Sequence, residues 1–232
     1  MFRPKIAVPG RFTESASALR YRGLVSARRL IEAVWLAGGD PVTLLPAEGP
    51  DGTDWAQRLD GFHGVLLPGG GDVTPTRYGM PIDDPSLYGM DELQDETDFT
   101  LAAYALEHGL PLLAVCRGLH VVNALLGGTL IIDMDVNHRH HSHVVALDDA
   151  TDHLGFGTAS VSASCYHHQA VDRVADRITV LGRAEDGAVE AVAIDAKAWA
   201  GGVQWHPEDI YDADPGQLSP FTALVTHARE GA

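Results

Sequence analysis

The sequence predicts an α/β fold, a three-layer sandwich whose central, mostly parallel sheet carries helices on both faces and continues into an antiparallel extension. Short β-rich apolar runs alternate with longer helical stretches in the first half, which is typical of parallel sheets built from βαβ units. After about residue 137 the pattern changes to shorter strands, which predicts the antiparallel part. No linker-like stretch divides the 232 residues, so we expect one domain over residues 1–232.

The first elements make one βαβ unit followed by a third strand. Lys5–Val8 is predicted to be a strand, Leu19–Ala37 a helix with apolar residues near helical spacing, and Pro41–Leu45 the second strand. Gly64–Leu67 is the third predicted strand and runs into the turn Pro68–Asp72. Successive glycines let this turn bend sharply and expose its N–H groups, so it is a candidate anion site.

Residues 72–94 are rich in Pro, Gly, Asp and Tyr without a sustained period, so we expect a long loop that covers the functional site. Asp95–His108 is predicted to be a helix, Leu112–Val115 a buried strand, and the segment from Cys116 to Gly127-Gly128 another helix. The remaining predicted strands are Val144–Leu147, Val161–Ser164, Ile178–Arg183, Val189–Ile194 and Gly202–Trp205, and the last helix is Ser219–Arg229.

The composition excludes several classes of partner. A formal net charge of −16 repels phosphate backbones and anionic membrane surfaces, so we expect neither a nucleic-acid nor a membrane partner. No apolar run has the length of a membrane span. The N-terminus lacks a signal-peptide core, which predicts a cytoplasmic protein. In that compartment the two cysteines, Cys116 and Cys165, are expected to be thiols rather than a disulfide.

Cys116 is the first candidate catalytic residue, because it lies where a buried strand passes directly into a helix. The helix dipole and the free N–H groups at such a junction favour the thiolate, which is the nucleophilic form. Gly118 fits a closely packed turn of this kind, since a side chain there would meet the neighbouring strand. A buried structural cysteine is the alternative.

His206-Pro207-Glu208 follows the last predicted strand and supports the catalytic interpretation. A histidine at a strand end can face the same crevice as Cys116 and move protons there. Glu208 would then fix the imidazole tautomer and stabilise the imidazolium. A surface histidine beside a charged turn is the alternative.

Six segments in this order resemble the class I glutamine amidotransferase family, which implies a flavodoxin-like fold. They are LAGGDPVTLLP at 36–46, PGGGD at 68–72, CRG at 116–118, GGTL at 127–130, YHHQAV at 166–171 and GVQWHPE at 202–208. Among the branches of this family, the free-standing γ-glutamyl-γ-aminobutyrate hydrolases, or C26-type peptidases, are the most similar. The resemblance covers roughly residues 5 to 208.

The resemblance implies a hydrolase that cleaves a γ-glutamyl amide, with Cys116 as nucleophile, His206 as general base and acid, and Glu208 as the orienting carboxylate. The backbone N–H groups of Gly70 and Arg117 would hold the oxyanion. Further residues implied to bind the substrate are Gly69, Gly71, His120, Tyr166, His167 and Gln169. The resemblance implies no metal and no organic cofactor. The expected binding partner is a small γ-glutamyl compound from polyamine catabolism. We also expect a homodimer, because dimers are common among small cytosolic enzymes.

Two positions depart from the family pattern. His120 stands where the family commonly has Gln, whose side chain helps hold the glutamyl group, so the family's substrate preference does not transfer at this position. Cys165 stands where the family favours Ser before the YHHQ string, and we interpret it as a conservative small replacement.

Two clusters of ionisable residues are interpreted as structural. His138, His140, His141 and His143 have the close spacing of metal ligands, but no Cys or carboxylate spacing completes a tetrahedral site, so a polar loop or strand is expected. The acidic residues of the long loop and the following helix are interpreted as a solvated face; they are Asp83, Asp84, Asp91, Glu92, Asp95, Glu96 and Asp98.

Three other functions remain open at this point. The first is the glutaminase component of an amidotransferase, although PGGGD followed by a long loop is more typical of a stand-alone hydrolase. The second is the chaperone or protease branch of related folds, in which His follows the cysteine directly, whereas Arg117 follows it here. The third is a non-catalytic binding protein on the same scaffold.

Overall fold

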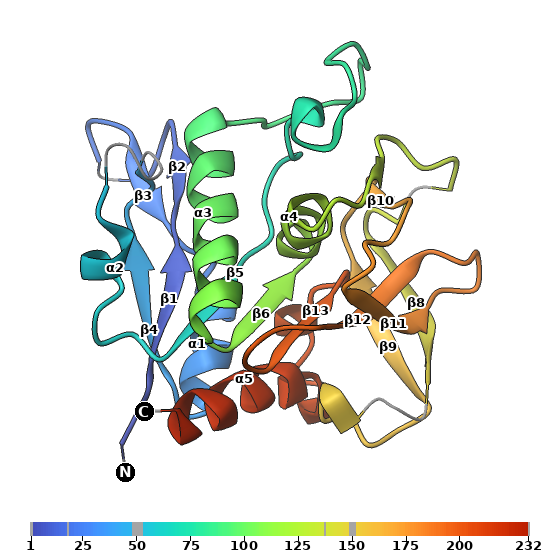
Figure 1. Ribbon diagram of the computed structural model, residues 1–232. Helices are drawn as coiled ribbons and strands as arrows, with labels where there is room; N and C mark the ends of the chain where they lie inside the picture. Colours follow the sequence, from blue (N-terminus) through green and yellow to red (C-terminus); the bar gives the residue numbers. More distant parts are fainter. Residues whose placement is uncertain (1, 18, 48–52, 137, 149–151, 232) are drawn as a thin grey trace.

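The computed structural model describes residues 2–17, 19–47, 53–136, 138–148 and 152–231 (Figure 1). The α-helices are α1 (Arg28–Leu36), α2 (Trp55–Arg58), α3 (Glu92–His108), α4 (Arg117–Leu125) and α5 (Ser219–Glu230). The strands are β1 (Lys5–Pro9), β2 (Arg11–Thr13), β3 (Gly23–Val25), β4 (Asp40–Leu44), β5 (Gly64–Leu67), β6 (Leu112–Val115), β7 (Leu130–Ile131), β8 (His141–Leu147), β9 (Ser160–Cys165), β10 (Ala170–Val171), β11 (Ile178–Arg183), β12 (Val189–Ile194) and β13 (Ala200–Val203). No helix in the described ranges combines the length and the apolarity needed to cross a membrane.

Nine strands of the described chain form one sheet in the order β4-β1-β5-β6-β13-β12-β11-β8-β9. Neighbours from β4 to β13 run parallel, and those from β13 to β9 run antiparallel. Helices α3 and α4 cover one face, and α1 and α5 cover the other (Figure 1). The three-layer α/β sandwich with an antiparallel extension, expected from the sequence, is confirmed.

The central strands are buried on both faces of the sheet. Successive side chains of a strand point to opposite faces, so Leu66 contributes to the core beneath α1 and α5, whereas Leu67 contributes to the core beneath α3 and α4. A strand covered on both sides needs an apolar residue at every position. All residues of β5 and β6 are buried, and both predicted ranges are confirmed.

The predicted helix over Leu19–Ala37 is wrong in its first half, because α1 begins only at Arg28. Gly23–Val25 instead forms β3, which pairs antiparallel with β2. The apolar side chains before α1 do not face the core, since Leu19 is 59% exposed and Tyr21 is 79% exposed. The helical spacing of these apolar residues therefore does not indicate a buried helix face in this segment.

Helix α3 begins one turn earlier than the predicted start at Asp95. The carboxylate of Asp91 accepts a hydrogen bond from the backbone N–H of Gln94 at 3.0 Å, so Asp91 caps the helix. Glu92 and Asp95 then fall in the first turn, where acidic side chains are favoured by the helix dipole.

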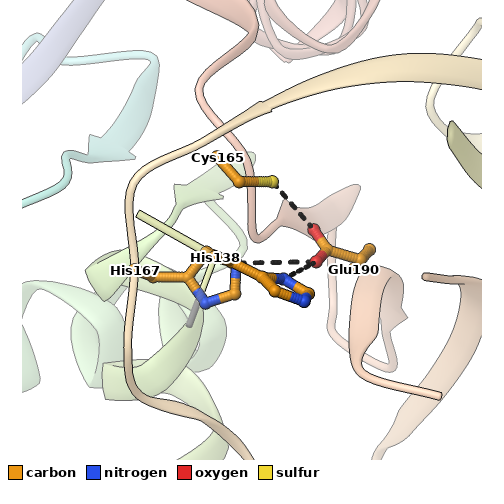
Figure 2. A group of neighbouring side chains, drawn as sticks. All are labelled: His138, Cys165, His167 and Glu190. Carbon is orange, nitrogen blue, oxygen red and sulfur yellow. Dashed lines mark hydrogen bonds and ion pairs between the residues drawn. The ribbon is translucent and has the colours of Figure 1, made fainter. Parts of the chain in front are cut away.

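The antiparallel half of the sheet encloses a group of polar side chains that the sequence did not predict (Figure 2). Cys165 at the end of β9 and Glu190 on β12 face His138, which precedes β8, and His167, which follows β9. Glu190 is completely buried. The spacing along the sequence did not predict that Cys165 and Glu190 would lie beside these histidines, because strand pairing brings both in from distant parts of the chain.

Candidate functional site

Cys116 occupies a strained turn between β6 and α4. Its backbone has φ 52° and ψ −108°, a region that residues with a side chain rarely adopt. A methyl group on Gly118 would lie 2.6 Å from the backbone oxygen of Leu67, so only glycine lets α4 pack this closely on β5. The close packing predicted for Gly118 is confirmed. The turn places Cys116 at the carboxyl edge of the sheet, at the first turn of α4.

His206 reaches the same edge of the sheet, because β13 is the parallel neighbour of β6 and Val203 pairs with Val115. Nδ1 of His206 lies 2.8 Å from Oε1 of Glu208. A methyl group on Gly69 would lie 2.7 Å from Cε1 of His206 and 3.7 Å from Cβ of Cys116. The imidazole therefore fills the space that the absent Gly69 side chain leaves beside the thiol.

The pKa of His206 reflects its two neighbours. Burial by itself lowers the pKa, but the negative charge of Cys116 and that of Glu208 outweigh it, and hydrogen bonds to both add to the effect. The net result is a pKa well above the ordinary 6.5. The raised pKa favours the imidazolium form of His206, which is the proton donor that a cysteine hydrolase needs for its leaving group.

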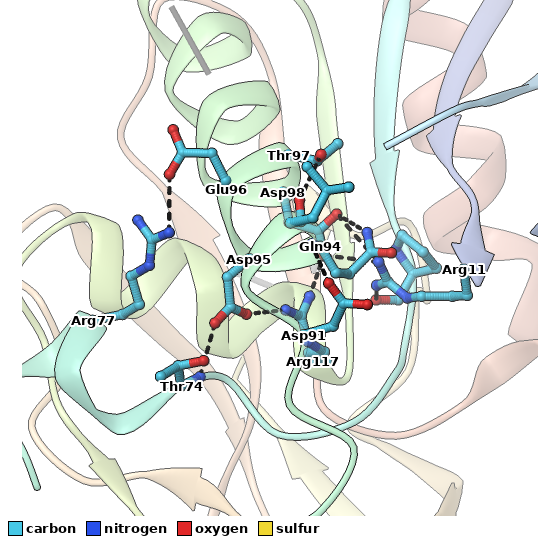
Figure 3. Close-up of polar contacts among 12 residues, drawn as sticks. Arg11, Thr74, Arg77, Asp91, Gln94, Asp95, Glu96, Thr97, Asp98 and Arg117 are labelled. Atoms are coloured by element: carbon cyan, nitrogen blue, oxygen red, sulfur yellow. Dashed lines mark hydrogen bonds and ion pairs between the residues drawn. The ribbon is translucent and has the colours of Figure 1, made fainter. Parts of the chain in front are cut away.

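The side chain of Arg11 binds the glycine turn Pro68–Asp72. The guanidinium of Arg11 donates to the carbonyl oxygens of Gly69 at 3.2 Å and Pro68 at 3.1 Å, and it binds Asp98 at 3.0 Å (Figure 3). Burial lowers the pKa of Arg11 to about 10, although Asp98 opposes this shift. A methyl group on Gly71 would lie 2.4 Å from the backbone oxygen of Gly89, so the long loop packs directly on the turn.

The expectation of a solvated acidic face is wrong for Asp95 and Asp98, which are both fully buried. Their carboxylates form ion pairs with the guanidinium of Arg117 (Figure 3). The two aspartates are three residues apart and therefore share the face of α3 that meets α4. The side chain of Arg117 thus anchors α4, and its backbone N–H belongs to the first turn of that helix, where N–H groups have no intrahelical partner.

A small pocket surrounds the thiol of Cys116 and brings together most of the residues predicted to bind substrate. It is lined by Gly70, Gly71, Asp72, Tyr88, Cys116, Arg117, His120, Tyr166, His167, His168 and Gln169. Its volume of about 10 Å³ is too small for a glutamyl group. Tyr88 and Tyr166, which line it, are 41% and 45% exposed. The expected position of the 72–94 loop over the site is confirmed by Tyr88.

His120 is buried and contacts the thiol of Cys116 through Gln204. Its Nε2 is 2.8 Å from Oε1 of Gln204, and the Gln204 amide nitrogen is 3.7 Å from Sγ of Cys116. Burial, with help from the nearby His167, lowers the pKa of His120 to about 3, so the imidazole is neutral. Gln204 was missed in the sequence, although it stands two residues before His206 in the GVQWHPE segment.

The remaining predicted binding residues have different surroundings. Tyr166 stacks edge-on against His140, with the ring centroids 4.5 Å apart. His167 is turned toward Glu190 by a hydrogen bond from Nδ1 to the backbone oxygen of Gln169 at 2.9 Å. Neither polar atom of the Gln169 amide makes a hydrogen bond of normal geometry to another described residue. Its side chain lines the pocket at the thiol and interacts with Tyr78.

Known proteins are similar to this chain in sequence or in fold. A model of the family Peptidase C26 matches residues 4–208. A Mycobacterium tuberculosis protein named "Putative glutamine amidotransferase Rv2859c" is 34% identical over 210 residues, which cover 85% of this chain and only 65% of that protein. "Gamma-glutamyl-gamma-aminobutyrate hydrolase PuuD" of Escherichia coli K12 is 30% identical over 199 residues, covering 78% of this chain and 77% of that protein. A glutamine amidotransferase of Thermotoga maritima aligns over 100% of this chain and 93% of that chain, with a TM-score of 0.61 and 14% identity, which shows a common fold.

Proposed function

This chain belongs to the peptidase C26 family of glutamine amidotransferase-like, cysteine-dependent hydrolases, and we propose that it cleaves the γ-amide bond of a γ-glutamyl amine. The observation that carries the proposal is the meeting of the strained Cys116 turn with the His206–Glu208 pair at one edge of the sheet. The name of the E. coli relative supports γ-glutamyl-γ-aminobutyrate as the substrate to test first.

The proposed reaction has two halves. The Cys116 thiolate attacks the γ-carbonyl carbon, and the tetrahedral intermediate collapses as His206 donates its proton to the leaving amine nitrogen. A γ-glutamyl thioester remains. Water then attacks the thioester, His206 accepts a proton from it, and glutamate leaves with the thiolate restored. Glu208 keeps the imidazole in one tautomer and stabilises its charged form.

The glycine turn and the first turn of α4 supply the oxyanion donors in this proposal. Gly70 and Arg117, whose backbone N–H groups would be the donors, line the same pocket as Cys116. Arg11 and Arg117 fix the two segments that carry these donors through Asp98. Donors held in place before the reaction stabilise the developing negative charge without reorganisation, and each is typically worth about 2.7–4 kcal/mol.

A second pocket, of about 370 Å³, supports an acidic leaving amine. It borders His206, which donates the proton to that amine, and its wall includes Arg11, Arg28 and Arg29. The side chain of Arg28 is 86% exposed there. The three arginines are paired with Asp98, Glu32 and Asp212, and Glu208 and Asp209 line the same pocket. A carboxylate on the leaving amine, as in γ-aminobutyrate, would therefore bind by exchanging with the present partner of the exposed Arg28 or Arg29.

The test is steady-state hydrolysis of γ-glutamyl-γ-aminobutyrate, glutamine and γ-glutamyl-n-propylamine by the purified chain. The last compound has the same carbon chain as the first but lacks the terminal carboxylate, so it isolates the contribution of the arginine pocket. We expect kcat/KM to be highest for γ-glutamyl-γ-aminobutyrate. The near-isosteric Cys116→Ser and the truncated Cys116→Ala should both lose turnover, and intact-mass spectrometry of the wild type should detect the acyl-enzyme.

Other outcomes distinguish the competing functions. Glutamine hydrolysis that requires a second subunit would replace the proposal by the glutaminase component of an amidotransferase. Binding of γ-glutamyl compounds with no acyl-enzyme and no turnover would replace it by a binding protein on the same scaffold.

A further inference from the structure

The polar group in the antiparallel half has the composition of a zinc site. His138, Cys165, His167 and Glu190 each offer one ligand atom, and these four atoms lie within 4.8 Å of one another (Figure 2). All four residues are buried. One thiolate, two imidazoles and one carboxylate make a tetrahedral set of N, S and O ligands of the kind that zinc takes in proteins.

In each of the two histidines, the tautomer leaves an unprotonated ring nitrogen that faces Glu190. Nε2 of His138 is 2.9 Å from Oδ2 of Asp186, so the Nε2 proton is donated outward and Nδ1 faces Glu190. In His167, Nδ1 donates to the backbone oxygen of Gln169 and Nε2 faces Glu190. Ligating histidines almost always have their second nitrogen bound in this way, to a carboxylate or a backbone carbonyl.

The atoms that face one another are left without hydrogen bonds. Nδ1 of His138, Nε2 of His167 and Oε1 of Glu190 are buried, and none makes a hydrogen bond of normal geometry within the described ranges of the chain. Each such atom costs about 1–3 kcal/mol when it stays unpaired. Two lone pairs directed at a carboxylate oxygen also repel it, and a cation between them removes both costs.

The spacing of the ligand atoms approaches that around a bound ion. Oε1 of Glu190 is 3.4 Å from Nδ1 of His138 and 3.5 Å from Nε2 of His167, and Oε2 is 3.9 Å from Sγ of Cys165. Bonds of about 2.0–2.3 Å at tetrahedral angles separate ligand atoms by about 3.3–3.6 Å. Small side-chain rotations therefore bring the four atoms to bonding distance.

We propose that His138, Cys165, His167 and Glu190 bind one structural Zn²⁺ ion. The thiol of Cys165 loses its proton to solvent on binding, and the thiolate and carboxylate then balance the charge of the ion inside the protein. A surface pocket of about 330 Å³, lined by His138 and His143, gives the ion a path from solvent. Nε2 of His143 lies 3.3 Å from Glu190 on that side and offers an additional donor during entry.

The site would fix one wall of the pocket at the thiol. His167 lies within the segment 166–169 that lines this pocket, so a bond from His167 to zinc ties the segment to β12 through Glu190. Cys165 and His138 tie the same ion to β9 and to the loop before β8. Four ligands leave no open position, which is typical of a structural rather than a catalytic zinc.

The test measures zinc by mass spectrometry in protein purified without a histidine tag and dialysed against buffered zinc. We expect one zinc per chain in the wild type and none in Cys165→Ser or His138→Ala. Two matched controls, Cys116→Ala and His141→Ala, change the other cysteine and an exposed histidine of the same segment, and both should keep the ion. Asp186→Asn should keep it with an affinity about 10- to 100-fold lower.

Wild-type protein that holds no more zinc than Cys165→Ser would overturn the proposal and leave protonated histidines as the partners of Glu190. If the Cys165 and His138 variants fail to fold, cobalt(II) added to metal-free wild type decides the question. A cysteinate-to-cobalt charge-transfer band is expected, and its absence would equally refute the site. None of these measurements depends on turnover, so the result is separate from that for the proposed hydrolase.

Discussion

His206 is bound to Glu208 through Nδ1, at 2.8 Å from Oε1, and the other carboxylate oxygen of Glu208 makes no hydrogen bond to a described residue. The bond fixes the imidazole with its Nδ1 proton directed at the carboxylate. Nε2 is then the nitrogen that exchanges protons on the side of Cys116. The His206–Glu208 pair therefore favours one orientation of the imidazole.

Glu208→Gln is expected to lower kcat by about 10²- to 10⁴-fold while KM changes little. The amide keeps the size of the side chain but loses the charge that stabilises the imidazolium, and it can present its N–H₂ group to Nδ1 and select the wrong tautomer. Steady-state kinetics on the best substrate measures the effect. Asp60→Asn is the control, since it neutralises an exposed carboxylate that lies before β5, away from the site. An equal loss in both variants would show a general effect of charge.

His206 is expected to keep its proton at neutral pH and lose it only well above pH 6.5. Burial lowers the pKa of His206, but the charges of Cys116 and Glu208 raise it by more, so the net pKa lies well above 6.5. As pH rises through this pKa, the proton needed by the leaving amine is lost and kcat falls. NMR titration of the His206 ring should show the raised pKa in the wild type and a lower one in Cys116→Ala. An unchanged titration would mean that the thiol does not carry the charge.

Gly118→Ala is expected to destabilise the fold by about 1–3 kcal/mol, the usual cost of overpacking. The added methyl group would lie 2.6 Å from the oxygen and 2.8 Å from Cβ of Leu67, and a backbone atom cannot rotate away. Gly231→Ala is the matched control, because its methyl group would meet only the His227 oxygen at 3.7 Å. Urea unfolding of both variants measures the difference. Equal stability would show that α4 shifts freely on β5.

Asp95→Asn is expected to cost about 3–5 kcal/mol, because it leaves part of the buried charge of Arg117 without a partner. Glu96→Gln in the next position is the control. It removes an ion pair with Arg77 in which both side chains are about one-third exposed, and such pairs contribute about 0.2–1 kcal/mol. Thermal and urea unfolding measure both. A small loss in Asp95→Asn would mean that Asp98 alone compensates Arg117.

The fold was largely predictable because its strands have clear local signals. The ranges of β5, β6, β11 and β12 match the predictions, since each is a short segment rich in Val, Ile, Leu or Ala. The error over residues 19–27 arose because apolar side chains in helical spacing lie on the surface there. Spacing alone does not tell a buried face from an exposed one.

The site residues were predictable only where a short sequence segment determines the local structure by itself. Cys116 at a strand–helix junction and His206-Pro207-Glu208 are local patterns. The burial of Asp95 depends on Arg117, 22 residues later, and the group around Glu190 depends on the pairing of β8, β9 and β12. No local pattern in the sequence reports contacts of that range, so both were interpreted as solvated or incidental.

His120→Leu is expected to lower kcat by about 3- to 10-fold, the equivalent of one hydrogen bond, with KM little changed. The imidazole binds Oε1 of Gln204 and thereby holds the Gln204 amide nitrogen 3.7 Å from Sγ of Cys116. Without this bond the amide can rotate and the thiolate loses a donor. His120→Gln restores a donor to Gln204 and should recover most of the rate, so the pair of variants separates positioning from simple loss of packing. If His120→Gln instead changes the ranking of substrates, His120 acts on the glutamyl group and not through Gln204. Steady-state kinetics on three γ-glutamyl amides distinguishes these outcomes, and thermal unfolding of each variant checks that its fold is intact.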